Sequence, residues 1–199
     1  MHPYPVPYPV FLDLRGRSCL VIGSGPLAEE KVQGLTAAGA VVTHRQSGYE
    51  EGDLDGMVLA IVCGQPPEVA DAVWLEAQRR NVLINTVDDL PRCGFLAPAV
   101  VRRGDLAVAI STNGKAPALA VRLRQRLEGE LGEEYGRFLS LAGTVRAPLA
   151  ARRPDFHERR ELWYRLVDSD VLDLLRQGNE EAARLRFKEI LGVAPGVNP

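Results

Sequence analysis

The fold of this chain is decided by one stretch, SCLVIGSGPLA at residues 18–28. Its first part, Ser18–Ile22, is a short apolar run of the kind found in buried parallel strands. A glycine-containing turn follows, and Pro26 suits the first turn of a helix. The stretch therefore predicts a strand, a tight turn and a helix.

The turn has the pattern G-x-G-x-x-A. The first glycine permits a tight turn, the second allows a pyrophosphate to approach the backbone, and a small third residue lets the helix pack on the strand. Because the pattern lies between a predicted strand and a predicted helix, it indicates a dinucleotide-binding turn. A simple tight turn is the alternative. The predicted cofactor-binding residues are Gly23, Ser24, Gly25, Pro26, Leu27 and Ala28.

Strands and helices alternate on both sides of this turn. We predict helices at 26–38 and 66–80, strands at 40–43, 57–62 and 82–84, and a loop at 44–56. This alternation is typical of parallel strands joined by crossover helices. Beyond residue 94 the pattern changes to an antiparallel pair at 95–101 and 106–110, followed by helices at 117–131, 133–143, 155–168, 169–177 and 179–191.

The composition narrows the class of protein. The 199 residues are 46% hydrophobic with a formal net charge of −2, which fits a globular core and gives no general attraction to nucleic acid. The N-terminus lacks a signal-peptide pattern, and no apolar run approaches the roughly 18 residues of a membrane span. Three widely spaced cysteines argue against a zinc site or a disulfide framework. We therefore expect a cytoplasmic protein with no nucleic-acid or membrane partner and no metal site. The cysteines and the isolated histidines are Cys19, Cys63, Cys93, His2, His44 and His157.

A second polar turn, Ser-Thr-Asn-Gly-Lys at residues 111–115, connects a short strand to a helix that starts near Pro117. Backbone N–H groups and the positive end of the helix dipole meet at such a junction, which suits an anion. The basic residues around it either bind substrate carboxylates or are ordinary surface charges. The predicted substrate-binding residues are Ser111, Thr112, Asn113, Gly114, Lys115, Arg102, Arg103 and Arg122.

Asp88 follows the fourth predicted strand. A carboxylate at the carboxyl end of a parallel sheet lies over the ligand cleft and can accept a proton from a substrate, but an N-cap or an Asx turn is an equal alternative.

An acid usually follows the second strand of an NAD-binding fold and holds the ribose hydroxyls. Here Arg45 ends that region and Glu50 is the first acid after it. Arg45 is either a contact for a 2′-phosphate or a solvated loop charge.

Several blocks of sequence occur in the order of one known family. They are Tyr8–Leu14, the Gly23 turn with Glu30 and Lys31, Asn85–Asp89, Cys93–Phe95, Pro98–Gly104, Ile110–Leu119, Arg159–Trp163 and Gly178–Ala182. Through these blocks, nearly the whole chain resembles the precorrin-2 dehydrogenase / sirohydrochlorin ferrochelatase family. These proteins are the standalone relatives of the N-terminal half of sirohaem synthase. Residues 85–119 are the most specific part of the resemblance.

The resemblance implies NAD-dependent oxidation of precorrin-2 to sirohydrochlorin, followed in some members by insertion of Fe²⁺ in the same cleft. It also implies a homodimer. The family's essential aspartate matches Asp88, as the base in dehydrogenation and the acceptor of pyrrole protons in chelation. Thr112 stands where some relatives carry a serine. A tetrapyrrole with many carboxylates fits the basic residues around the second turn.

The departures from the family pattern are concentrated on the cofactor side. Relatives carry a longer segment, with another short strand, before the part that corresponds to Asp53–Gly56. They tend to have Ala-Thr-Asp-Asp where this chain has CGQPP at residues 63–67, and Ala116 replaces a serine. We therefore expect a shortened sheet and a less complete cofactor side.

The predicted fold class is α/β, in three regions. These are a Rossmann-like NAD-binding domain with a shortened sheet at 1–97, a dimerisation and substrate region at 98–148, and an α-helical C-terminal domain at 149–199. The predicted function is precorrin-2 dehydrogenase, with or without ferrochelatase activity. The alternatives are a chelatase that has lost the use of NAD, and a non-catalytic protein that binds a tetrapyrrole or a nucleotide.

Overall fold

The computed structural model describes residues 7–196, so His2 lies outside the described residues. The chain divides into two compact units. The first runs up to Ala97 and also includes Asn113–Lys115, and the second contains residues 98–112 and the chain from Ala116 onward.

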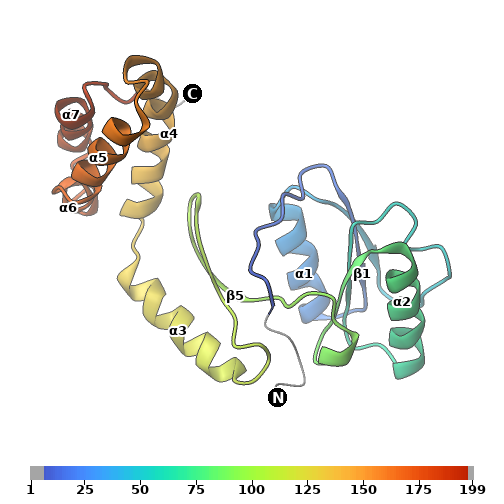
Figure 1. Ribbon diagram of the computed structural model, residues 1–199. Helices are drawn as coiled ribbons and strands as arrows, with labels where there is room; N and C mark the ends of the chain where they lie inside the picture. Colours follow the sequence, from blue (N-terminus) through green and yellow to red (C-terminus); the bar gives the residue numbers. More distant parts are fainter. Residues whose placement is uncertain (1–6, 197–199) are drawn as a thin grey trace. The chain divides into compact units, whose positions relative to one another are not determined.

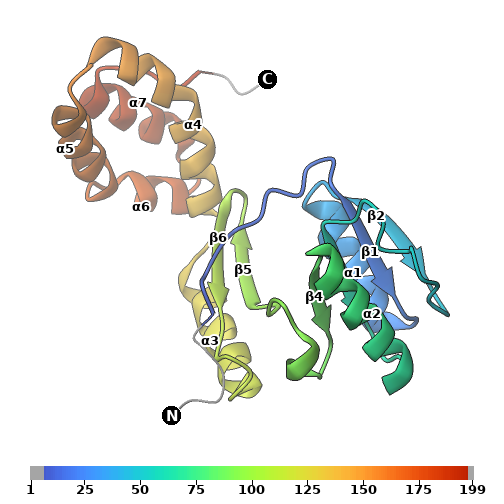
Figure 2. The ribbon, with the colours of Figure 1, turned by 45° about the vertical axis from the view of Figure 1, so that its right-hand side comes forward.

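The first unit is built on a four-stranded parallel sheet with the order β2-β1-β3-β4 (Figure 2). Helix α1 packs with Cys19 and Val21 on one face, while α2 packs with Leu20 and Ile22 on the other. The alternation along one strand therefore places a helix on each face, as a doubly wound sheet requires. The elements are β1 Ser18–Ile22, α1 Pro26–Ala37, β2 Val41–Arg45, β3 Leu59–Val62, α2 Pro67–Arg80 and β4 Leu83–Thr86.

This topology creates a switch point between β1 and β3. The chain passes from β1 to β2 on one side and then crosses back to β3 on the other. Ligands of open α/β sheets bind at the carboxyl ends of the strands at such a point. The predicted Rossmann-like fold is confirmed, with shifted strand bounds. Strand β2 is 41–45 rather than 40–43, β3 is 59–62 rather than 57–62, and β4 is 83–86 rather than 82–84, so the connecting loop is 46–58 rather than 44–56.

The second unit joins an antiparallel hairpin to helices, as predicted (Figure 1). Asp155 begins α5 by accepting a hydrogen bond from the Glu158 N–H at 2.7 Å, and Asn179 begins α7 in the same way. These caps satisfy helix N–H groups that have no partner within the helix. The elements are β5 Ala99–Arg103, β6 Leu106–Ile110, α3 Pro117–Glu130, α4 Glu134–Arg152, α5 Phe156–Val167, α6 Val171–Arg176 and α7 Glu180–Leu191.

The predicted helix end near residue 143 is wrong, because α4 continues to Arg152 with Pro148 inside it. Val145 and Leu149, both fully buried, lie on the core face of this last part of the helix. Their burial offsets the lost hydrogen bond and the steric cost of an internal proline, which together are about 3 kcal/mol. Helix α4 also crosses the predicted boundary between residues 148 and 149, and the division of the second unit into two domains stays a prediction.

Across residues 7–196, no helix is long and apolar enough to cross a membrane. Within the same range, no three histidine, cysteine or carboxylate side chains gather in a group that could hold a metal ion.

Candidate active site

The glycine turn at the end of β1 has the geometry that its sequence pattern requires. Gly23 has a φ of 126°, and a Cβ added there would lie 2.2 Å from the carbonyl oxygen of Cys63, at the end of β3. Only glycine fits, because the turn passes against the neighbouring strand at the switch point. Ala28, fully buried, packs α1 onto the sheet.

Gly25 serves the turn differently. It is the N-cap of α1 with a φ of 83°, and an added Cβ would meet no atom within 4 Å. Pro26 follows at the first helical position, and no side chain caps the helix. An uncapped helix start beside open space is the arrangement that a phosphate needs. Ser24 and Leu27, the other residues of the turn, are exposed.

His44 lies beside this turn, which the sequence did not indicate. Its Nε2 is 2.8 Å from the Gly23 carbonyl oxygen, and its Nδ1 is 3.9 Å from a carboxylate oxygen of Glu29 in the first turn of α1. The imidazole therefore ties the end of β2 to the glycine turn. The position of His44 at the end of the second strand could have indicated this contact, but the sequence pattern assigned residue 44 to a loop.

Arg45, the last residue of β2, pairs with Asp53 of the following loop. The acid that pairs with Arg45 is thus Asp53, although Glu50 comes before it in the sequence. Arg45 therefore lies in a strand rather than in a loop, and its partly exposed side chain pairs with Asp53. Sequence spacing could not find Asp53, because the fold of the loop decides which acid returns to the strand.

Asp88 lies just beyond the carboxyl end of β4, exposed and with a φ of 64°. Left-handed backbone is uncommon for residues other than glycine, and such strain is concentrated at functional sites. Asp88 is not a helix N-cap, because Asp89 is the N-cap of the short 3₁₀-helix η1, Leu90–Arg92.

The segment around Asp88 is held from both sides. Asn85, buried in β4, donates a hydrogen bond to the Phe95 carbonyl at 2.9 Å. Arg92 donates to Asp71 of α2 at 2.6 Å and to Asp89 at 2.5 Å. These two carboxylates raise the pKa of Arg92 further above its ordinary value. Asp88 is thus an exposed carboxylate on an anchored turn.

Part of the polar turn 111–117 packs beside this segment. Asn113 has a φ of 53° and Gly114 a φ of 70°. A Cβ added to Gly114 would lie 2.5 Å from the side chain of Leu90, so the turn touches η1 two residues after Asp88. The structure therefore brings residues 113–115 and Asp88 together within the first unit. Lys115 is exposed there.

The remaining predicted substrate residues belong to the second unit. The Thr112 hydroxyl accepts a hydrogen bond from the Ala116 N–H at 3.3 Å, just before α3. Arg103 donates to the Glu128 carbonyl at 2.9 Å and lies 3.4 Å from a Glu133 carboxylate oxygen. Ser111 and Arg102 are exposed, as is Arg122, which donates to Gln125 at 3.0 Å.

The cysteines and His157 form no reactive or metal-binding group among the described residues. Cys19 and Cys63 are buried and Cys93 is half-buried, all as free thiols, and burial raises the pKa of each. His157 makes an edge contact with Phe156. None of the three thiols has the lowered pKa of a reactive thiolate.

Comparison with known families covers most of the chain. Residues 10–45 and 41–99 match an NAD(P)-binding domain, residues 103–130 match the central part of sirohaem biosynthesis proteins, and residues 134–191 match the sirohaem synthase dimerisation region. The first match consists of two segments that meet at β2, immediately before the short loop 46–58.

Individual relatives agree with these matches. The chain is 35% identical to a sirohaem synthase of Photobacterium profundum over 211 residues, covering 96% of this chain and 44% of the relative. It is 36% identical to that of Methylobacillus flagellatus over 203 residues, covering 92% and 44%. The chain thus spans less than half of these relatives. In fold it is similar to SirC, a precorrin-2 dehydrogenase, with a TM-score of 0.71, 23% identity, and coverage of 94% of this chain and 100% of SirC.

The fold, the glycine turn at the switch point and these matches agree with one another. The chain belongs to the family of homologues of the N-terminal half of sirohaem synthase.

Proposed function

We propose that this protein oxidises precorrin-2 to sirohydrochlorin with NAD⁺ as the cofactor. The observation that carries the proposal is Asp88: an exposed carboxylate, held on left-handed backbone beyond β4 and beside residues 113–115. Family membership supports the substrate class, since sirohaem synthases are the relatives that match most of this chain.

The glycine turn fits a dinucleotide. The open space at Gly25 and the uncapped start of α1 suit the pyrophosphate, while the close approach of Gly23 to Cys63 fixes the turn at the switch point. We assign cofactor binding to the predicted turn residues. When bound, the nicotinamide would supply the acceptor for a hydride.

The reaction removes a hydride and a proton from the tetrapyrrole, so a base is needed. Asp88 accepts the proton, because its carboxylate is exposed and the segment that carries it is anchored by Arg92. Lys115 and the Asn113–Gly114 backbone bind substrate carboxylates next to it. In the second unit, the guanidinium groups of Arg102 and Arg122 and the hydroxyl of Ser111 are further donors for substrate carboxylates. Arg103 and Thr112 have structural partners as well, so they support this region more than they recognise the substrate.

We also propose a cytoplasmic homodimer. The sirohaem synthase dimerisation region matches residues 134–191, so α4–α7 take part in the dimer contact in addition to the predicted region 98–148. Helix α3 has exposed apolar side chains that a partner chain would cover. They are Leu119, Val121 and Leu123, which are 53%, 43% and 38% exposed.

A second candidate function is insertion of Fe²⁺, as a substrate, into sirohydrochlorin. The short loop 46–58 favours it as the activity that would survive a weakened cofactor site. Asp88 would then accept the two pyrrole protons that the metal displaces one at a time, passing the first to solvent water before it takes the second.

The test uses the purified protein with precorrin-2 and NAD⁺, following sirohydrochlorin absorbance and NADH. We expect both products to appear together. Absence of both would overturn the dehydrogenase proposal. In a parallel reaction with sirohydrochlorin and Fe²⁺, a rate equal to the protein-free control would exclude the chelatase. Tight tetrapyrrole binding without either turnover would identify a non-catalytic binding protein.

A further inference from the structure

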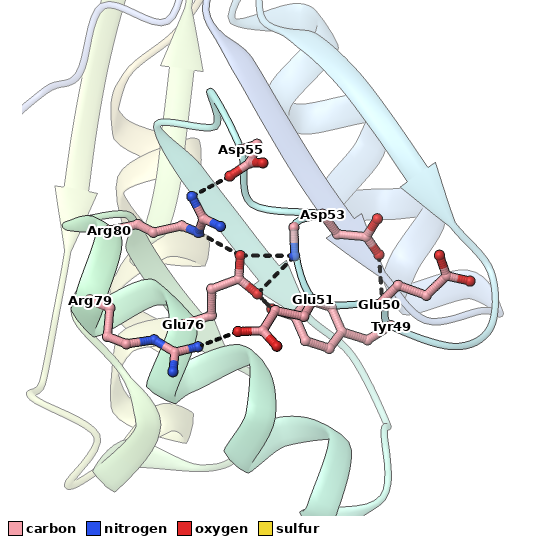
Figure 3. Close-up of polar contacts among 9 residues, drawn as sticks. Tyr49, Glu50, Glu51, Asp53, Asp55, Glu76, Arg79 and Arg80 are labelled. Carbon is pink, nitrogen blue, oxygen red and sulfur yellow. Dashed lines mark hydrogen bonds and ion pairs between the residues drawn. The ribbon is translucent and has the colours of Figure 1, made fainter.

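A buried carboxylate of α2 accepts hydrogen bonds from the loop between β2 and β3, residues 46–58, and so fixes the loop against the helix (Figure 3). Glu76 of α2 is only 1% exposed. Its carboxylate accepts hydrogen bonds from the Tyr49 hydroxyl, from the Gly52 N–H at 3.1 and 3.2 Å, and from Arg80 at 2.5 Å. A buried carboxylate with this many donors fixes the path of the loop.

Further ion pairs hold the loop at its surface. Arg80 also pairs with Asp55, and Arg79 pairs with Glu51 at 3.0 Å (Figure 3). Leu54, 1% exposed, fills the core beneath the loop. The loop therefore has one defined conformation although it contains no strand.

This conformation places Asp53 at the end of β2. One Asp53 oxygen accepts a hydrogen bond from Arg45, and the other accepts one from the Glu50 N–H at 3.0 Å. The Asp53 side chain is 9% exposed, whereas that of Arg45 is 41% exposed. The positive charge at the end of β2 is therefore matched by a carboxylate that the loop holds in place.

The end of the second strand is where a Rossmann fold distinguishes its two nicotinamide cofactors. A carboxylate there binds the ribose hydroxyls of NAD, whereas an unpaired arginine accommodates the 2′-phosphate of NADP. A phosphate approaching Arg45 would lie next to the Asp53 carboxylate and near the exposed Glu50. With a phosphate charge of about −1.5 to −2, that approach is electrostatically unfavourable.

We propose that the Arg45–Asp53 pair is the specificity determinant that makes this site select NAD over NADP, with Glu76 as the positioning residue that holds Asp53 there. The proposal rests on the dinucleotide site of the proposed function. It differs from the two interpretations of Arg45 that the sequence left open, because the partly exposed guanidinium is paired with Asp53 and, in this proposal, receives no 2′-phosphate.

The test measures dissociation constants of NADH and NADPH for the full chain by fluorescence, without a tetrapyrrole. The wild type should bind NADH more tightly. Asp53→Asn should tighten NADPH by about fivefold, the scale of a partly exposed ion pair, with NADH changed by less than about twofold. The double variant Asp53→Asn with Arg45→Gln should lose that gain, because the guanidinium that would bind the phosphate is absent.

Asp55→Asn is the matched control, since it removes the same charge from the same loop but pairs with Arg80 instead of Arg45. It should leave the NADPH-to-NADH ratio unchanged. Glu76→Gln should shift the ratio in the direction of Asp53→Asn, which a merely structural role would not do.

Circular dichroism would confirm that each variant is folded. Three results would overturn the proposal: equal wild-type affinities for the two cofactors, no change in Asp53→Asn, or an equal change in Asp55→Asn. If the wild type bound neither cofactor, the dinucleotide site of the proposed function would fail with it, which is a distinct result.

Discussion

The glycine turn after β1 and the polar turn at 111–117 are both proposed anion-binding sites, but they are built differently. The glycine turn is fixed by packing, since Gly23 lies against Cys63 and Ala28 is buried under α1. The substrate side presents two residues on left-handed backbone, namely the exposed Asp88 and the half-buried Asn113. The difference teaches that Gly23 tolerates no added volume, because it lies against the backbone of a neighbouring strand, whereas the proposed role of the substrate side depends on individual side chains such as that of Asp88.

The largest effect is expected at Asp88. Asp88→Asn removes the base while keeping the size of the side chain, so sirohydrochlorin formation should fall by about 10²- to 10⁴-fold. NADH affinity should stay the same, because the glycine turn is untouched. Steady-state kinetics and a fluorescence titration measure the two effects separately.

Asp89→Asn is the control for this change, since Asp89 pairs with Arg92 instead of facing solvent alone. It should cost some stability and leave most of the turnover. If Asp88→Asn retained activity within about threefold, a barrier change under about 1 kcal/mol, the assignment of the base would be wrong.

The second-largest effect is a difference in the free energy of unfolding between alanine variants of Gly23 and Gly25, two glycines of the same turn. Gly23→Ala puts a Cβ 2.2 Å from the Cys63 carbonyl oxygen at a positive φ, so it should lower the free energy of unfolding by about 2–3 kcal/mol. Gly25→Ala carries only the backbone strain of its φ of 83°, about 1–2 kcal/mol. Its methyl group should nevertheless block the cofactor. Urea unfolding and NADH titration give the two readouts, and equal unfolding losses for both variants would contradict the packing argument.

The third effect is a pH dependence on the cofactor side. Burial alone would raise the pKa of Glu76, but hydrogen bonds from Tyr49, Gly52 and Arg80 outweigh it and hold the pKa below its ordinary value. The carboxylate's contribution to stability is then fully present above the unfolded pKa of about 4.3 and is lost as the pH falls below it. Glu76→Gln should cost about 1–2 kcal/mol at neutral pH and flatten the acid loss of stability.

Glu134 in the second unit provides the matched comparison. It is 4% exposed and accepts two hydrogen bonds from Arg176, at 3.1 and 3.0 Å. Its pKa is also lowered, because those bonds and backbone N–H groups outweigh burial. Glu134→Gln should therefore change acid stability but not cofactor binding. A loss of NADH affinity in Glu134→Gln would mean that unfolding, rather than the loop, explains the Glu76 result.

Most of the fold could be predicted from local pattern. Apolar runs, glycine turns and prolines at helix starts located β1, α1, α2 and the β5–β6 hairpin, because each depends on neighbouring residues. The end of α4 could not be predicted, since the burial of Val145 and Leu149 overrides the local effect of Pro148. That burial is a property of the assembled helices.

The candidate site divides in the same way. The glycine turn and Asp88 follow directly from strands, so the sequence located them, although their roles stay predictions. Asp53 and Glu76 were missed because they meet Arg45 and Tyr49 only after the loop folds onto α2. The available indication in the sequence was Glu76, an acidic residue on the apolar face of the helix that is now α2.

The smallest effect concerns the basic residues. Arg103 is 19% exposed and anchored to Glu128 and Glu133, whereas Arg122 is exposed and bonded to Gln125. Arg103→Gln should therefore act on stability, and Arg122→Gln on the KM for the tetrapyrrole, each by about 0.2–1 kcal/mol or up to about fivefold. Raising the salt concentration should shrink the Arg122 effect, because an exposed charge pair is screened. An Arg103 effect on KM at unchanged stability would instead place Arg103 among the residues that contact the substrate.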